Sequence, residues 1–255
     1  MKIGCALAVV LLAISGHAGA QRLLEFPDDL AFSATEVNAL AARAFGARLR
    51  TLAGSRQLDP DPALGERLKR IFPRLLRAAI YERPAAEGYA WEIHACRGCE
   101  EHALAMPGGK VLVSADFVRS RALTDGELAY LLAHEIGHVL AEHTRAFATA
   151  ARYFADNGLA RDYGDLQQEL DKSLPLLLRM RSLSVQQELE ADYIGFILGA
   201  HAGYAPESML SLLEKLRSNS TPLVGTHPAD DERLQRARAM LETARRLAAR
   251  AHAGR

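Results

Sequence analysis

Several features are scarce in this chain of 255 residues. It has three cysteines, one tryptophan and 6% aromatic residues, and neither sign of charge is in excess, because 31 Lys and Arg balance 31 Asp and Glu. So few cysteines exclude a small disulfide-stapled scaffold, and a composition that is 49% hydrophobic and 24% charged excludes a disordered or collagen-like chain. A net charge of zero gives no electrostatic reason to expect nucleic acid as a partner. One or two globular domains remain.

Long apolar runs are also scarce, and the one extended run lies near the N-terminus. Residues 3–14 are mostly apolar, Lys2 precedes them, and Ala18-Gly19-Ala20 follows as a small-x-small cleavage site. This order predicts a signal peptide over residues 1–20 and a mature chain, residues 21–255, that forms a single exported domain. The alternative is an uncleaved N-terminal anchor. No later run approaches the ~18 residues of a membrane span, so we expect a periplasmic protein that is soluble or peripherally attached to a membrane.

The remaining pattern predicts a mostly helical α+β fold with one small antiparallel sheet. Between residues 89 and 118, alternating apolar residues, the Pro107-Gly108-Gly109 turn and a β-branched segment predict two or three strands. Polar sequence at residues 156–171 indicates an irregular segment. Apolar residues at helical spacing and capping signals predict helices over residues 34–54, 62–81, 125–143, 184–198, 206 onward and 229–249.

The strongest chemical signal is the motif His134-Glu135-Ile136-Gly137-His138. Residues four apart lie on one face of a helix, one turn apart, so both imidazoles can bind one Zn²⁺ ion. Glu135 lies beside that face, where it can act on a water molecule at the metal. The capping signal of Thr124 and Glu127 places the motif inside a helix. We therefore predict one zinc ion per chain, with Glu135 as the catalytic carboxylate.

Zinc needs a third protein ligand, and the sequence offers several. In a continuous helix, His143 lies about 140° round from the second histidine and points away, as expected of a surface or second-layer residue. Glu142 shares the ligand face but lies about 12 Å along the axis from the first histidine. Glu188 is the better candidate, because Asp192 lies one turn further on and can accept the outer N–H of a ligating imidazole. The alternative is a solvated acidic helix face.

These motifs occur in an order that resembles a known family. The motif at residues 134–138, E-L-E-A-D at residues 188–192, A-M-P-G-G at residues 105–109 and T-H-P-A-D-D-E-R at residues 226–233 together look like the HtpX and CAAX-prenyl-endopeptidase family of gluzincin zinc metallopeptidases. The resemblance covers about residues 60–245 and is closest to an exported branch without membrane spans. It implies a zincin-like domain whose zinc ligands are His134, His138 and Glu188, with Glu135 catalytic and Asp192 behind the ligands.

The resemblance also bears on residues around the ligands. His227 would face the cleft as an oxyanion stabiliser or a fourth ligand, and the alternative is a histidine held at a helix start by Pro228. Arg233 would tie this segment to the core. Two positions depart from the family pattern: His102 replaces the usual Asn before the Pro-Gly-Gly turn, and Val185 replaces a frequent Arg before the third ligand. Both departures weaken any inference about the substrate.

Cys96 and Cys99 are the two cysteines of the expected mature chain. In an oxidising compartment a local disulfide between them is the first interpretation. A second metal site with His94 and His102 is an alternative. A redox-active pair is a further alternative, although the two cysteines do not open a helix as in thioredoxin-like motifs.

Together these features predict a zinc endopeptidase that acts on unfolded or misfolded envelope proteins. We expect the strand at residues 103–106 to lie at an exposed edge of the sheet, where an extended substrate backbone can pair with it. Envelope quality control is implied by the resemblance alone. Two other hypotheses remain: a latent chaperone or binding protein in which residues 156–183 plug the zinc site, and a zinc hydrolase of non-peptide substrates.

Overall fold

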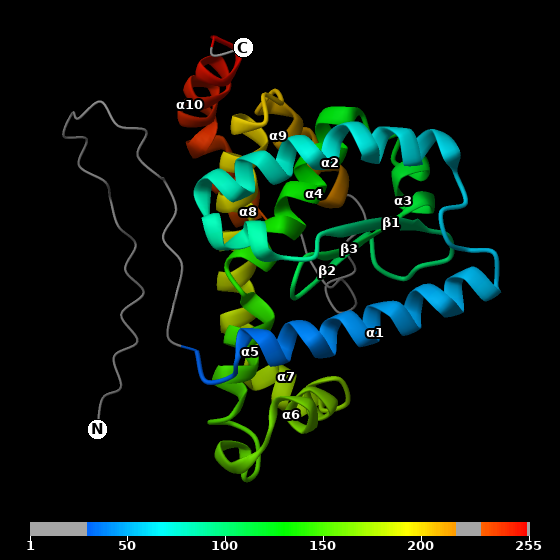
Figure 1. Cartoon of the computed structure of the whole chain (residues 1–255). Helices are drawn as coiled ribbons and strands as arrows, with labels where there is room; N and C mark the ends of the chain where they lie inside the picture. The colour runs from blue at the N-terminus through cyan, green and yellow to red at the C-terminus, as the bar shows by residue number, and fades with distance from the viewer. Residues whose placement is uncertain (1–29, 218–230, 254–255) are drawn as a thin grey trace.

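A computed structural model describes residues 30–217 and 231–253 of the chain, and the predicted signal peptide and His227 lie outside these ranges. Within them, helices surround a small sheet (Figure 1). The strands are β1 (Glu92–Cys96), β2 (Ala103–Met106) and β3 (Lys110–Ser114). The helices are α1 (Ala34–Gly54), α2 (Pro62–Glu82), η1 (Pro84–Gly88), α3 (Ala115–Ser120), α4 (Asp125–Leu140), α5 (His143–Ala151), η2 (Gly158–Ala160), α6 (Tyr163–Leu170), α7 (Leu174–Arg179), α8 (Arg181–His201), α9 (Glu207–Arg217) and α10 (Asp231–Ala253).

The mostly helical α+β fold class is confirmed, and the capping signals explain where two of the helices begin. The side chain of Asp61 accepts hydrogen bonds from the first backbone N–H groups of α2, which starts with Pro62 as predicted. At the start of α4, Thr124 and Glu127 form both hydrogen bonds of a capping box. These caps satisfy N–H groups that have no partner inside the helix.

Two expected helix boundaries were wrong, and one segment is more regular than its sequence suggested. Helix α4 ends at Leu140 instead of running to residue 143, because Glu142 adopts a left-handed backbone conformation with φ of 52° and α5 starts after it. Helix α8 begins at Arg181, so the predicted cap at Ser184 lies inside it. Residues 156–171 are irregular only in part, since α6 occupies residues 163–170 and its few apolar side chains are buried at helical spacing within a polar sequence.

The predicted antiparallel sheet is in fact mixed. Strand order is β1-β3-β2, with β2 antiparallel to β3 across the Pro107-Gly108-Gly109 turn and β1 parallel to β3. All five residues of β3 are buried, whereas β1 and β2 are only partly buried. The most apolar strand therefore takes the centre of the sheet, and β1 pairs with it from the other side. Alternation along each strand shows which faces are buried but not which strand is the neighbour.

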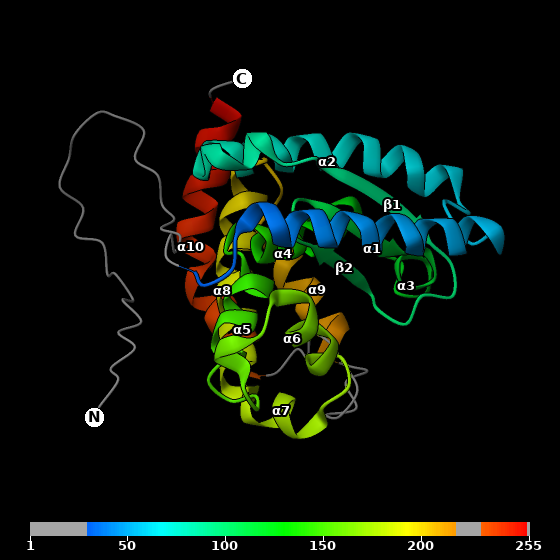
Figure 2. The same ribbon diagram turned by 60° about the horizontal axis from the view of Figure 1, so that its bottom comes forward.

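Both faces of the sheet are covered by helices. Val111 and Val113 of β3 belong to the main core with α2 and α4, whereas Leu112 packs against Phe45 and Leu52 of α1. The sheet therefore lies between α1 on one face and α2 with α4 on the other (Figures 1 and 2). Strand β2 pairs with β3 on one side only, and no described strand pairs with its other edge.

Helix α4 is the centre of the main core. Every residue from Glu127 to Gly137 is buried, and α2, α8 and α9 pack around it together with β2. A second apolar cluster lies apart from this core in the α5–α7 lobe, residues 143–180, where Phe32 and Val37 from the N-terminal side also pack. None of the helices within the described ranges combines the length and the apolar character needed to cross a bilayer.

The capping carboxylate Glu127 links α4 to α9 and makes the fold sensitive to acid. Burial would raise the pKa of Glu127, but hydrogen bonds from Lys215, Ser211 and Thr124 outweigh burial and lower it. A lowered pKa in the folded state contributes stability above the unfolded pKa of ~4.3 that is lost as the pH falls through the lowered value.

We expect Glu127→Gln to reduce the free energy of unfolding at pH 7 by about 1–3 kcal/mol, because it removes a charged hydrogen-bond acceptor. Urea unfolding of both proteins from pH 7 to pH 3 is the measurement, and the difference between them should shrink below about pH 4. Glu66→Gln, on the exposed face of α2, is the control with little expected effect. A difference that persists unchanged at pH 3 would contradict the assignment.

Candidate metal centre

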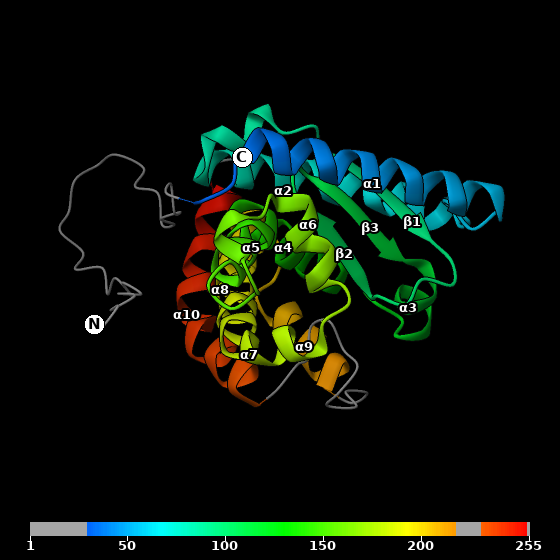
Figure 3. The same cartoon turned by 90° about the horizontal axis from the view of Figure 1, so that it is seen from below.

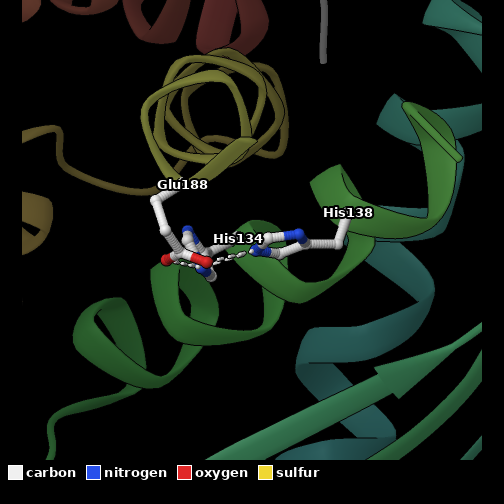
Figure 4. A group of neighbouring side chains, drawn as sticks. All are labelled: His134, His138 and Glu188. Carbon is white, nitrogen blue, oxygen red and sulfur yellow. Dashed lines mark hydrogen bonds and ion pairs between the residues drawn. The ribbon is translucent and has the colours of Figure 1, made fainter. Parts of the chain in front are cut away.

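The three predicted zinc-ligand residues come together between two helices. Helix α4 carries His134 and His138 on one face, and Glu188 of α8 lies opposite them (Figure 4). One ligand atom from each lies within 4.8 Å of the others. This is the one group of three potential metal ligands found among residues 30–217 and 231–253, and it contains neither the cysteines nor His94 or His102.

The donor atoms of this group face one another directly. Nε2 of His134 and Nε2 of His138 are 3.1 Å apart, and the two oxygens of the Glu188 carboxylate lie 3.4 Å from one ring nitrogen each. All three side chains are mostly buried, with exposed fractions of 5%, 15% and 11%. Two imidazole nitrogens and a carboxylate that converge in a sheltered place are the donor set of a His₂Glu zinc site.

Asp192 fixes the orientation of the first imidazole. Oδ1 of Asp192 lies 2.9 Å from Nδ1 of His134, so the neutral ring carries its proton on Nδ1 and turns the lone pair of Nε2 towards the other donors. Arg233 of α10 donates two hydrogen bonds to the same carboxylate, at 2.6 and 2.7 Å, and its third nitrogen lies 3.5 Å from Glu188. Arg233 therefore holds the carboxylates of both acidic residues in place.

The charges around His134 favour a cation. Burial lowers the pKa of His134, but Asp192 and Glu188 outweigh burial and raise the pKa to about 10. Burial likewise raises the pKa of Asp192, and Arg233 and His134 outweigh it so that the pKa stays below its usual value. A site that holds a proton this strongly between two carboxylates is also suited to a divalent cation, which must displace that proton. The residues present therefore fit a metal ion.

The sequence suggested that His143 points away from the site, but in the structure its ring contacts His138. Because α4 stops at Leu140, the chain turns and brings Nδ1 of His143 to 2.9 Å from Nδ1 of His138. The other ring nitrogen of His143 lies 3.3 Å from Glu190, and Gln187 donates a hydrogen bond to the backbone carbonyl of His143. His143 is thus a second-layer residue that orients the second imidazole. Sequence reasoning missed this contact because it assumed a continuous helix.

The two helices of the site can approach closely because each has a glycine at the crossing. A Cβ atom added to Gly195 of α8 would lie 2.9 Å from the backbone nitrogen of His134. A Cβ atom added to Gly137 of α4 would lie 2.9 Å from the backbone oxygen of Ala191. Any side chain at either glycine would therefore push α8 away from α4, and with it Glu188 and Asp192.

Glu135 of α4 lies in a pocket that His134 of the metal group also lines. Glu135 is buried, and His102 and apolar side chains of α9 also line this narrow pocket. The ring of His102 stacks on Phe117 at a centroid distance of 4.0 Å. The histidine that departs from the family pattern thus lies in the same pocket as the predicted catalytic carboxylate.

Glu142 and the cysteines lie away from the ligands. Glu142 forms ion pairs with Arg83 and Arg145, so its carboxylate is held at the end of α4 and not at the metal group. Cys96 and Cys99 are joined by a disulfide. Both ring nitrogens of His94 lie next to acidic side chains, Asp59 and Glu92, so this ring is not directed at the cysteines.

The fold and the arrangement of His134, His138 and Glu188 are those of a zincin-like metallopeptidase. Residues 62–241, most of the chain, match the model of peptidase family M48. The chain therefore belongs to peptidase family M48. This match confirms the family resemblance that the sequence motifs indicated.

Several metalloendopeptidases and proteases are similar to this chain. The mitochondrial metalloendopeptidase OMA1 of Saccharomyces cerevisiae is 29% identical over 197 residues, 70% of this chain and 56% of the relative. The beta-barrel assembly-enhancing protease of Escherichia coli is 28% identical over 207 residues, 74% of this chain and 41% of the relative. Metalloprotease LoiP of Escherichia coli is 29% identical over 146 residues, 54% of this chain and 57% of the relative. This chain spans about half the length of these relatives.

The close crossing of α4 and α8 predicts that adding one methyl group at Gly195 destabilises the protein. Gly195→Ala should lower the free energy of unfolding by about 1–3 kcal/mol, because the backbone of α4 cannot yield to the new atom. It should also weaken zinc binding, since Glu188 moves with α8. Thermal unfolding and zinc titration are the measurements. Gly65→Ala is the matched control, because its added Cβ meets nothing within 4 Å in α2 and should stabilise the protein by about 0.5–1 kcal/mol.

The hydrogen bond from His134 to Asp192 predicts a specific loss of metal affinity. Asp192→Asn keeps the shape of the side chain but removes the charge that orients the imidazole, so we expect zinc affinity to fall about 10–100-fold. Competition with a chromogenic chelator measures this affinity. Asp165→Asn, on the exposed surface of α6, is the control. Equal zinc affinity in all three proteins would show that Asp192 has no role behind the ligand.

Proposed function

We propose that this chain is a zinc-dependent endopeptidase. The observation that carries the proposal is the convergence of His134, His138 and Glu188, with Asp192 and Arg233 holding them from behind, in a member of peptidase family M48. The names of the relatives, which include metalloendopeptidases and proteases, support the same class of reaction.

Each residue of the centre has a distinct task in peptide hydrolysis. His134, His138 and Glu188 would hold the zinc ion, which when bound supplies a Lewis acid that polarises a carbonyl group and acidifies water. Glu135 accepts a proton from the attacking water molecule and then donates it to the nitrogen of the leaving amine. His143 and Asp192 keep the two imidazoles in the ligating orientation.

A substrate backbone would pair with the unpaired edge of β2. A pocket runs from Ala105, Met106 and the following turn to His138, and Val37 and Asn38 of α1 form its other wall. An extended peptide on this edge would make main-chain hydrogen bonds and reach the metal centre. Main-chain pairing depends little on side chains, which fits unfolded proteins as the substrate class.

The proposal includes a location and a biological role. The signal-like N-terminal segment and the disulfide between Cys96 and Cys99 both favour export to an oxidising compartment, the periplasm. Misfolded envelope proteins would then be the substrates, in protein quality control. The name of the beta-barrel assembly-enhancing protease supports an envelope role, whereas that of OMA1 is mitochondrial.

The burial of the centre supports a second candidate function. Glu135 and His134 are almost completely buried, so a substrate reaches them only after some part of the surface moves. A protein that stays in this closed state would be a latent chaperone or binding protein that keeps the zinc fold. Cleavage by the isolated chain distinguishes the two functions.

The decisive experiment compares the zinc-loaded chain of residues 21–255 with Glu135→Gln on an unfolded model protein. We expect cleavage to fall about 10²–10⁴-fold in the variant while zinc stays bound, because only the proton acceptor is lost. A chelator should abolish cleavage by the parent protein, and added zinc should restore it.

The control is Glu214→Gln, an exposed carboxylate of α9, which should cleave like the parent protein. Zinc content of every sample is measured alongside. Equal cleavage by Glu135→Gln would refute the assigned role, and no cleavage by zinc-loaded parent protein would favour the latent function.

A further inference from the structure

The exposed apolar side chains of this protein are concentrated in one place. Eight large apolar side chains are exposed in the described part of the chain, and six of them belong to the α5–α7 lobe. Tyr153 is 71% exposed and Leu174 is 65% exposed. We call this set the lobe surface, and its members are Tyr153, Phe154, Leu159, Leu174, Leu177 and Leu178. Exposed apolar side chains that are scattered singly over a surface are common, whereas several in one small lobe indicate a binding surface.

Hydrogen bonds tie together the segments that carry the lobe surface. Arg179 of α7 donates a hydrogen bond to the backbone oxygen of Phe154, which ties α7 to the chain after α5. Arg152 donates another to the backbone oxygen of Leu159. Figures 2 and 3 show α7 at the outer end of the lobe, away from the sheet and from α1.

Helix α7 has two apolar faces, and only one of them serves the fold. Leu176, and Met180 just after the helix, are buried in the cluster of the lobe. Leu174, Leu177 and Leu178 follow the spacing i, i+3 and i+4, which places them together on the outer face. The buried cluster of the lobe does not use this second stripe, which is exposed and accessible to an external partner.

The charges beside the outer leucines indicate what that partner is. Lys172, Arg179 and Arg181 are exposed around α7, and residues 172–187 contain no acidic side chain. The acidic residues of the lobe all lie between positions 156 and 171, where Glu169 pairs with Arg161 and Asp171 accepts a hydrogen bond from α6. Asp156 is exposed two residues after Phe154, so the basic edge is confined to α7 and the residues next to it. A leucine stripe edged by Lys and Arg matches a bilayer surface with anionic headgroups.

We propose that the lobe surface binds the face of an anionic lipid bilayer. A helix of six residues cannot span a membrane, so α7 would lie in the headgroup region with its leucines towards the acyl chains. Tyr153 and Phe154 beside it are aromatic residues of the kind that occupy the membrane–water interface. The proposal extends beyond peptide hydrolysis and does not depend on it, because it assigns a surface that no ligand of the metal centre shares.

Vesicle flotation with the chain of residues 21–255 tests the proposal, since removing residues 1–20 takes away the N-terminal apolar run. The vesicles contain either equal parts of phosphatidylglycerol and phosphatidylcholine or phosphatidylcholine alone. We expect binding to the anionic vesicles that weakens as salt is added. Absence of binding to both kinds of vesicle at low salt would overturn the proposal. All samples are loaded with zinc and contain no peptide substrate, so the outcome is independent of peptidase activity.

Two variants locate the binding surface. The double substitution Leu174→Gln with Leu178→Gln should reduce vesicle affinity by about tenfold or more, because the apolar stripe is lost. The control is Tyr81→Gln with Tyr193→Gln, which removes two exposed large apolar side chains that lie outside the lobe. This variant should bind vesicles like the parent protein. Lys172→Gln with Arg181→Gln should lower affinity for anionic vesicles by about tenfold. Circular dichroism checks that each variant is folded.

Unchanged vesicle binding by the leucine variant would refute the lobe surface as the membrane contact. Light scattering after size exclusion covers the other class of partner. If the parent protein is an oligomer that the leucine variant breaks into monomers, and neither protein binds vesicles, the surface is an interface between protein chains and the lipid proposal is wrong.

Discussion

The close crossing of α4 and α8 is the constraint on which the rest of the structure depends. Gly137 and Gly195 let the two backbones approach to a distance at which even one methyl group would collide with main-chain atoms. That approach places the carboxylates of α8 beside the imidazoles of α4, so the metal centre and the core are one packing arrangement. Side chains alone could not assemble this centre across a wider gap.

Around this crossing, polar contacts extend outward in two directions. On one side, Arg233 of α10 holds Asp192, which orients His134. On the other side, His143 contacts His138, and the left-handed turn at Glu142 makes this contact possible. Each ligating imidazole is therefore oriented by a different segment of the chain. Such pre-orientation reduces the freedom that a metal ion would otherwise have to remove when it binds.

The second apolar cluster gives the lobe a different character from the main core. Its outer face is apolar although its interior is already filled by Leu176 and Met180. The lobe leads directly into α8, so its position is coupled to the helix that carries Glu188. A protease held at a lipid surface by this lobe would meet substrates near the membrane before they enter the cleft beside β2.

The sequence alone predicts the helix that carries His134, Glu135 and His138, the cap that starts it and the family, because these depend on residues a few positions apart. It also pointed to Glu188 and Asp192 across some fifty residues, through the order of motifs. The mixed strand order, the contact of His143 with His138 and the exposure of the outer leucines of α7 became evident only from the folded chain. The reason is physical: spacing along a chain defines local faces, whereas strand partners, helix ends and neighbouring surfaces are selected by packing between distant segments.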